Sequence, residues 1–156
     1  MMYTRIFTAI VLVSSLVGLS SPAFANQVIV GSWRTVVTIT FPFVDEFTGL
    51  DTYTRDGTAI ASNSPDGSTS TGHGAWERLS DSEENDFAET VLFTVFDPFA
   101  FPPGTEFVKV RGEMKVVSRD EMTGIFIVEF LDAGFSVLFL ASGTRLHTRI
   151  EFEPMP

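Results

Sequence analysis

Apolar residues recur at every second position along most of the chain from residue 28 onward, and no stretch of about ten residues has helical spacing. The first such run covers residues 33–43. One face of this run carries its large apolar residues and one threonine: Trp33, Thr35, Val37, Ile39, Phe41 and Phe43. Alternation of this kind is typical of a half-buried β-strand. Further strands are predicted at residues 50–55, 58–63, 74–79, 87–96, 107–118, 124–131, 135–142 and 143–152.

Glycine, proline and small polar residues separate these runs. Asp56-Gly57 favours a tight hairpin turn between the second and third strands. Residues 97–105 are too rich in proline to stay in a β-ladder. They include Phe99 and Phe101, so we expect this loop to fold over an apolar surface such as the mouth of a barrel. Strands of even spacing with short connections predict an all-β fold, a single antiparallel up-and-down β-barrel of about eight strands. A β-sandwich is the alternative.

The first 25 residues have the three parts of an export signal. Arg5 charges the first part, residues 6–19 form the apolar part, and Ala23-Phe24-Ala25 has the small-x-small pattern of a cleavage site. The apolar part is shorter than the roughly 20 residues that a membrane span needs. We therefore expect residues 1–25 to be a cleaved secretory signal peptide and residues 26–156 to form one domain. The protein is then secreted or periplasmic, with no stable membrane span after cleavage.

Composition narrows the chemistry of this domain. The 156 residues include no cysteine, which excludes disulfides, thiolate catalysis and cysteine-ligated zinc. The 20 acidic and 10 basic residues give a formal net charge of -10, and no basic cluster is present for a nucleic-acid backbone. His73 and His147 are far apart in sequence and have no acidic partner at metal-site spacing. We therefore expect no nucleic-acid partner, no metal site and no cofactor.

Gly31-Ser32-Trp33, at the start of the first long strand, resembles the Gly-x-Trp signature of the lipocalin and calycin group. The resemblance implies that this segment, Gly31 included, closes one end of a barrel with the indole of Trp33. It also implies that a basic residue of the last strand packs across the indole, and either Arg145 or Arg149 is in the right region to do so.

Two further segments, residues 72–76 and 143–145, resemble those of small exported bacterial lipocalin-like proteins. The Thr-Asp-Tyr motif of the better-known lipocalins is missing. The allene oxide cyclase-like barrel has a related architecture, and that group includes cyclases and isomerases.

An eight-stranded barrel has an interior just wide enough to be filled by side chains or to hold one small ligand. The more apolar face of each strand supplies the predicted lining: Val37, Ile39, Tyr53, Trp76, Phe93, Val110, Phe126, Phe130 and Phe139. Such a lining suits a small hydrophobic molecule. The same residues also fit a packed aromatic core without a cavity. The sequence therefore leaves open both a ligand-binding barrel and a structural or interaction domain with a filled core.

A third possible function is a cofactor-free enzyme of the cyclase or isomerase type acting on an apolar substrate, which would need an inward acid or base. His73 lies between two glycines on the loop side of a strand, where an exposed, non-catalytic histidine is the alternative. Glu129 is the one acidic residue of an apolar strand, and its position favours the outward face. Tyr53 shares a face with Asp51 and Arg55, which fits either a polar ligand contact or an exposed cross-strand charge pair.

Two neighbouring strands also carry aliphatic residues on the faces opposite to those assigned inward: Ile125, Ile127, Leu138 and Leu140. Adjoining exposed aliphatic residues usually mark an interface. We therefore expect a homodimer with these residues at its centre. A bulge that shifts the faces by one residue would instead turn them inward.

Overall fold

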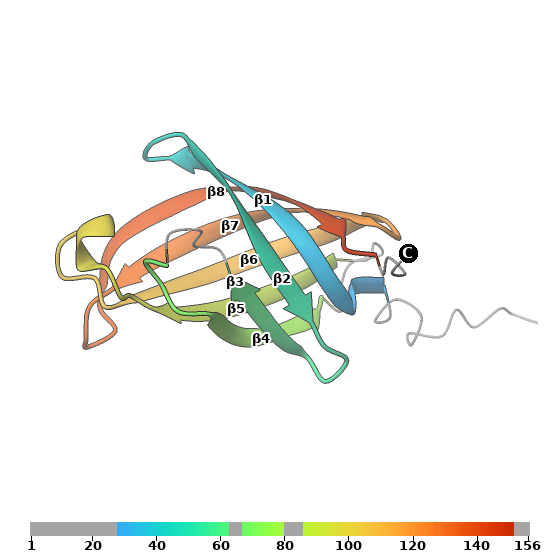
Figure 1. Cartoon of the computed structure of the whole chain (residues 1–156), viewed down its shortest axis with the longest axis horizontal. Helices are drawn as coiled ribbons and strands as arrows, with labels where there is room; N and C mark the ends of the chain where they lie inside the picture. Colours follow the sequence, from blue (N-terminus) through green and yellow to red (C-terminus); the bar gives the residue numbers. More distant parts are fainter. Residues whose placement is uncertain (1–27, 63–66, 80–85, 152–156) are drawn as a thin grey trace, which may run out of the picture.

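A computed structural model describes residues 28–62, 67–79 and 86–151. Within these residues, eight strands follow one another: β1 (Gly31–Phe41), β2 (Asp45–Tyr53), β3 (Thr58–Ser62), β4 (Gly72–Arg78), β5 (Asp86–Thr94), β6 (Phe107–Ser118), β7 (Glu121–Leu131) and β8 (Val137–Arg149). Each strand pairs antiparallel with the next, and β8 returns to pair with β1, so the sheet closes into a barrel (Figure 1). The predicted all-β, up-and-down barrel of about eight strands is confirmed.

The two ends of the barrel differ (Figure 1). At one end the start of β1 meets the end of β8, where Trp33 is paired with Arg149. At the other end the loop between β5 and β6 carries a short 3-10 helix, η1 (Pro98–Ala100). This helix begins after Asp97, whose side chain accepts a hydrogen bond of 3.0 Å from the backbone N–H of Phe99.

The largest differences from the predicted strand boundaries are in β8 and β2. The runs predicted at residues 135–142 and 143–152 form one continuous strand, β8, because Gly143 does not end the ladder. A Cβ at this position would overlap the carbonyl oxygen of Thr38, so glycine lets β8 approach β1 closely. Strand β2 begins earlier than predicted, at Asp45, because its pairing with β1 continues over this polar segment.

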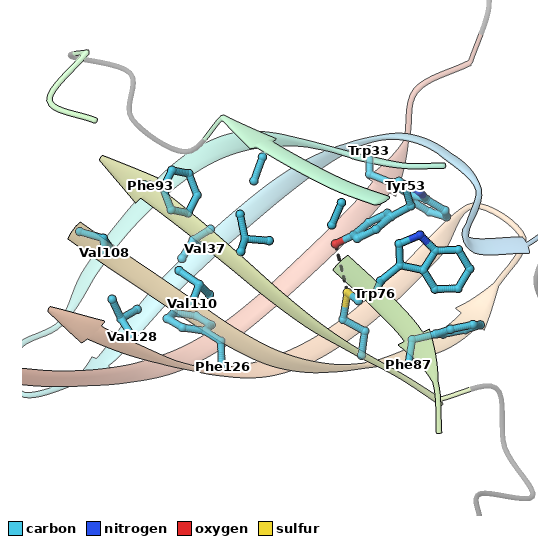
Figure 2. Close-up of a cluster of buried hydrophobic side chains, with 14 of the residues drawn as sticks. Trp33, Val37, Tyr53, Trp76, Phe87, Phe93, Val108, Val110, Phe126 and Val128 are labelled. Atoms are coloured by element: carbon cyan, nitrogen blue, oxygen red, sulfur yellow. Dashed lines mark hydrogen bonds between the residues drawn. The ribbon is translucent and has the colours of Figure 1, made fainter. Parts of the chain in front are cut away.

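The end of the barrel at which β1 starts is tightly packed, and we call this part the closed half. Its buried side chains are Ile29, Trp33, Tyr53, Trp76, Phe87, Met114 and Met122. The rings of Trp76 and Phe87 meet edge to face with centroids 5.6 Å apart, and Tyr53 and Trp76 do so at 6.4 Å. Figure 2 shows these aromatic rings gathered at one end, while Val37, Phe93, Val108, Val110, Phe126 and Val128 lie toward the other end.

No helix in the described ranges is long and apolar enough to cross a membrane. The predicted signal peptide, residues 1–25, lies outside the described residues. The described part of the predicted domain, residues 26–156, forms the barrel.

Candidate functional site

A cavity of about 590 Å³ lies inside the barrel at the end that carries η1. Its lining includes seven of the nine residues predicted to face the lumen: Val37, Ile39, Phe93, Val110, Phe126, Phe130 and Phe139. The other two, Tyr53 and Trp76, lie in the closed half. The interior is therefore hollow at one end and filled at the other.

The loop between β5 and β6 covers part of this cavity, as its two phenylalanines predicted. Residues 99–102 all belong to the cavity lining. The ring of Phe101 lies 6.0 Å from that of Phe130, which anchors the loop to β7. Phe99 is 96% exposed, although it borders the same cavity. The mouth of the barrel therefore has an aromatic cover with one ring packed inward and one ring facing outward.

Small residues at inward positions make room for Phe126 and Arg145, two large side chains that line the cavity. Along β8 the inward residues between Phe139 and Arg145 are Ala141 and Gly143, which carry almost no side chain. On β6, a Cβ at Gly112 would overlap Nη2 of Arg145. Glycine at this position therefore makes room for the guanidinium group inside the barrel.

Arg145 lies at the inner end of the cavity, because it is the deepest lining residue of β8. Its side chain is only 3% exposed, and its Nη1 forms an ion pair with the carboxylate of Glu89. The guanidinium carbon lies 5.4 Å from the centre of the Phe126 ring. Among the described residues, Nε and Nη2 find no hydrogen-bond acceptor. Burial lowers the pKa of Arg145, but the opposing effect of Glu89 and other acidic neighbours is larger and raises it, so the group stays charged.

Arg145 belongs to a set of buried polar groups that we call the polar layer: Thr35, Asp51, Glu89, Arg145, His147 and the hydroxyl group of Tyr53, whose ring packs in the closed half. On β1 the inward order is Trp33, Thr35 and Val37, and on β5 it is Phe87, Glu89 and then Val91 and Phe93. On each strand a polar residue thus stands between the closed half and the apolar cavity wall.

Hydrogen bonds join most of the polar layer. The hydroxyl group of Tyr53 donates to Oε2 of Glu89 at 2.9 Å, and Thr35 donates to Oδ2 of Asp51 at 2.6 Å. Nε2 of His147 lies 3.2 Å from the same Asp51 oxygen. Burial, followed by the nearby Glu89 and Asp51 carboxylates, raises the pKa of Tyr53 well above its usual value. Tyr53 is therefore a neutral hydrogen-bond donor within the polar layer.

The three candidates for acid or base chemistry do not come together in the structure. Tyr53 lies in the polar layer, with its hydroxyl group directed at Glu89. His73 is exposed on the outer face of β4, within the strand. Glu129 lies on β7 opposite Lys109, on the outward side. None of these three residues is among those that line the cavity. The exposed charge pair considered for Asp51 is wrong, because this side chain is buried with Tyr53.

Glu129 has basic partners on the neighbouring strand. Its Oε2 lies 2.9 Å from Nζ of Lys109, and its Oε1 accepts a hydrogen bond from Arg111. The hydrogen bond from Lys109 lowers the pKa of Glu129; burial opposes this shift, while the positive charges of Lys109 and Arg111 reinforce it. Glu129 is therefore an ionised partner in a cross-strand cluster, and not an acid with a raised pKa.

The closed end is sealed by Arg149, which settles the choice between the two arginines that the sequence left open. Its guanidinium carbon lies 4.1 Å from the centre of the Trp33 ring. The same group donates hydrogen bonds to the carbonyl oxygens of Val28, Val30 and Arg119. Gly31 has a φ of 140°, and a Cβ there would lie 2.7 Å from Nη1 of Arg149. Glycine in the Gly-x-Trp segment thus leaves room for the guanidinium group of Arg149.

Comparison with known proteins supports the fold. No family model matches the chain, and no curated protein matches it in sequence. The structure of EF1p2_mFAP2b bound to DFHBI is similar with a TM-score of 0.54 and 15% identity, over 83% of this chain and 100% of that one. The chain has a lipocalin-like β-barrel fold.

Two more solved structures are similar at lower scores. A redesigned β-barrel has a TM-score of 0.47 and 14% identity, over 81% of this chain and 96% of that one. The S-type phycobiliprotein lyase CPES from Guillardia theta has a TM-score of 0.48 and 12% identity, over 87% of this chain and 96% of that one.

Sequence reasoning about this lipocalin-like barrel missed the polar contribution to the cavity. The sequence predicts an apolar strand over residues 87–96 without a role for Glu89, and it suggests Arg145 only for the closure of the barrel. One signal was present: Glu89 falls on the same face as Phe87, Val91 and Phe93, so the alternation alone places a carboxylate inside. A buried carboxylate needs a buried cation, and Arg145 is that partner.

Proposed function

We propose that this protein binds a small, largely apolar molecule in the cavity below the loop of η1. The cavity itself carries the proposal: about 590 Å³ is within the range of small-molecule sites, and most of its wall is aliphatic or aromatic. The guanidinium group of Arg145 lies at its inner end, and a small number of polar groups is what usually orients a ligand in an apolar site. EF1p2_mFAP2b, whose structure has a similar fold, is bound to DFHBI, which is consistent with ligand binding by a barrel of this fold.

The direct test is binding of a neutral apolar dye, N-phenylnaphthylamine, followed by fluorescence. Val110 lies on the cavity wall, and its replacement in Val110→Trp fills the space with a larger side chain. We expect the wild-type protein to bind the dye and Val110→Trp to lose at least about tenfold in affinity while circular dichroism shows that the barrel is retained.

Thr90→Trp is the matched control, because Thr90 is exposed on the outer face of β5. This variant should bind the dye as the wild-type protein does. Equal binding by both tryptophan variants would place the dye elsewhere and contradict the proposal. Native mass spectrometry of protein purified from its own host should then identify the bound molecule in the wild-type protein and find less of it in Val110→Trp.

We also propose that the protein acts outside the cytoplasm, after loss of residues 1–25. The three-part pattern of this segment supports the proposal. The intact mass of the protein recovered from the periplasm or the medium should correspond to a chain that begins at Asn26. Recovery of the full-length chain from the cytoplasm alone contradicts it.

A homodimer through the outer face of β7 and β8 is the last part of the proposal. The four residues predicted to form its centre are all exposed on that surface: Ile125, Ile127, Leu138 and Leu140. Leu138 is exposed at a position where the pairing of β7 with β8 shifts register, between Phe130 and Leu131. An exposed aliphatic patch of this kind is an expected feature of a protein interface.

A further inference from the structure

Arg145 offers unused hydrogen-bond donors at the inner end of the cavity. Its side chain is 3% exposed, and only Nη1 is engaged, by Glu89. Neither Nε nor Nη2 has an acceptor among the described residues. A buried guanidinium N–H without an acceptor is costly, so a group that accepts from it gains more than an ordinary hydrogen bond provides.

The charges around Arg145 decide which acceptor fits. The ion pair with Glu89 already neutralises the guanidinium group. Asp51 lies next in the polar layer, and Asp45 lines the cavity near its mouth. Of the described residues that line the cavity, Arg145 alone is basic. The site therefore provides positive N–H donors without a net positive charge.

A carboxylate is a poor match for such a site. It would lose its hydration inside an apolar cavity and would come close to the carboxylate of Glu89, without an unpaired cation to compensate. An uncharged carbonyl oxygen loses far less hydration and still accepts a strong hydrogen bond from the guanidinium group.

Resting on the function proposed above, we propose that the ligand is an apolar molecule with an uncharged carbonyl-type oxygen, as in a ketone, ester or amide. The end of the ligand that carries this oxygen enters the cavity first, and the oxygen accepts a hydrogen bond from Arg145. The apolar remainder lies against the wall formed by β6, β7 and β8, below the loop of η1. The barrel then selects against the carboxylate of the same chain length.

The test compares three ligands of one chain length as competitors of N-phenylnaphthylamine at neutral pH. They are the alkane tridecane, the methyl ketone of the same chain (tridecan-2-one) and the fatty acid of the same chain (tridecanoic acid). The ketone should displace the dye at concentrations about tenfold lower than the alkane, since a hydrogen bond to a charged donor contributes that much in a dry site. The fatty acid should be weaker than the ketone by a similar factor. The infrared carbonyl band of the bound ketone should also shift to lower frequency than in a hydrocarbon solvent.

Two variants separate the charge of Arg145 from its donors. In Glu89→Gln the shape is kept but the guanidinium charge is no longer balanced, so the fatty acid should gain about tenfold relative to the ketone. The double variant Arg145→Met with Glu89→Gln removes both charges together and avoids an unpaired buried carboxylate. In this variant the ketone should bind no better than the alkane. Arg111→Met, on the outer face of β6, is the control and should behave as the wild-type protein does.

The outcomes distinguish this inference from the proposed function. If the dye binds but the ketone has no advantage over the alkane, or if the fatty acid binds best to the wild-type protein, the choice of ligand is wrong and the cavity remains a binding site. If neither the dye nor any of the three ligands binds, the proposed function is wrong and the inference with it. The wild-type comparison needs no variant, so it decides the matter even if a substitution prevents folding.

Discussion

Arg145 and Arg149 both point inward from β8, but they contact different parts of the barrel interior. Arg149 is paired across the β1–β8 ladder with Trp33, and Arg145 is paired with Val37. The first therefore meets the indole of the closed half, and the second reaches the polar layer and the cavity. The sequence alone could not assign these roles, because the choice depends on the register of strands that are more than a hundred residues apart.

The closure by Arg149 leads to a prediction about stability. Arg149→Met keeps much of the apolar stem but removes the stacking on Trp33 and the hydrogen bonds to three backbone carbonyl groups. We expect the free energy of unfolding in urea to fall by about 2 kcal/mol. Arg34→Met changes an exposed arginine on the outer face of β1 and should cost less than about 0.5 kcal/mol. Similar losses in the two variants would show that the closure has no special role.

The two buried carboxylates also depend on partners from distant strands. Asp51 lies in a short predicted strand with polar residues, and Glu89 lies in a long predicted strand that is mostly apolar. His147 contacts Asp51 and Arg145 pairs with Glu89, and both partners come from β8. Alternation predicts that both face inward, but it does not identify His147 and Arg145 as their partners. The polar layer depends on the strand register of the closed barrel, which brings these side chains together.

At the scale of the elements, the outer faces of β6 and β7 are joined by the cluster around Glu129. Glu129→Gln should lower the free energy of unfolding by about 1 kcal/mol at pH 7, because it removes the charge that Lys109 and Arg111 share. The pKa of Glu129 is lower in the folded than in the unfolded protein. Its contribution is therefore present above the unfolded value and is lost as the pH falls through the folded value.

The direction of this pKa shift can be tested by measuring stability as a function of pH. Urea denaturation of the wild-type protein and Glu129→Gln should differ at pH 7 and should agree once the pH is below the folded pKa of Glu129. Glu113→Gln alters an exposed carboxylate of β6 and is the control, with little difference at either pH. A difference between wild type and Glu129→Gln that persists unchanged in acid would contradict an electrostatic origin.

The loop of η1 gives a prediction about ligand exchange. Phe101 anchors this loop against Phe130, so Phe101→Ala should loosen the cover of the cavity. We expect stopped-flow measurements to show the dye leaving about fivefold faster, in line with the loss of one aromatic pair. Phe96→Ala removes an exposed ring that does not line the cavity, and its release rate should match the wild type. Equal release from all three proteins would mean that the loop does not limit exchange.

Alternation along the sequence predicted the elements well where strands are long and two-faced. The run at residues 107–118 coincides with β6, because its charged and apolar residues separate cleanly between the two faces. The prediction failed where backbone contacts override side-chain pattern. Gly143 reads as a turn residue in sequence, but the close approach of β1 uses it inside a strand, and the polar start of β2 is held by its pairing with β1.

At the scale of the whole molecule, closure of the sheet produces two interiors in one barrel. The pairing of β8 with β1 leaves no open sheet edge between them, and the aromatic residues of the closed half fill one end. This packed end provides stability without any disulfide, since the chain has no cysteine. The other end remains hollow, and the guanidinium group of Arg145 lies at its base. Stability and binding are thus assigned to opposite ends of the same strands.

The outer surface leads to a prediction about assembly. Ile125 is 61% exposed at the proposed dimer centre, and Ile125→Glu would place a charge in that interface, where it would be buried without a partner. Sedimentation velocity should give twice the chain mass for the wild-type protein and the single chain mass for Ile125→Glu. Val117→Glu changes an exposed residue near the end of β6, away from the four patch residues, and should stay dimeric. A monomeric wild-type protein, or a dimer that survives Ile125→Glu, would assign this aliphatic surface to something other than a second copy of the chain.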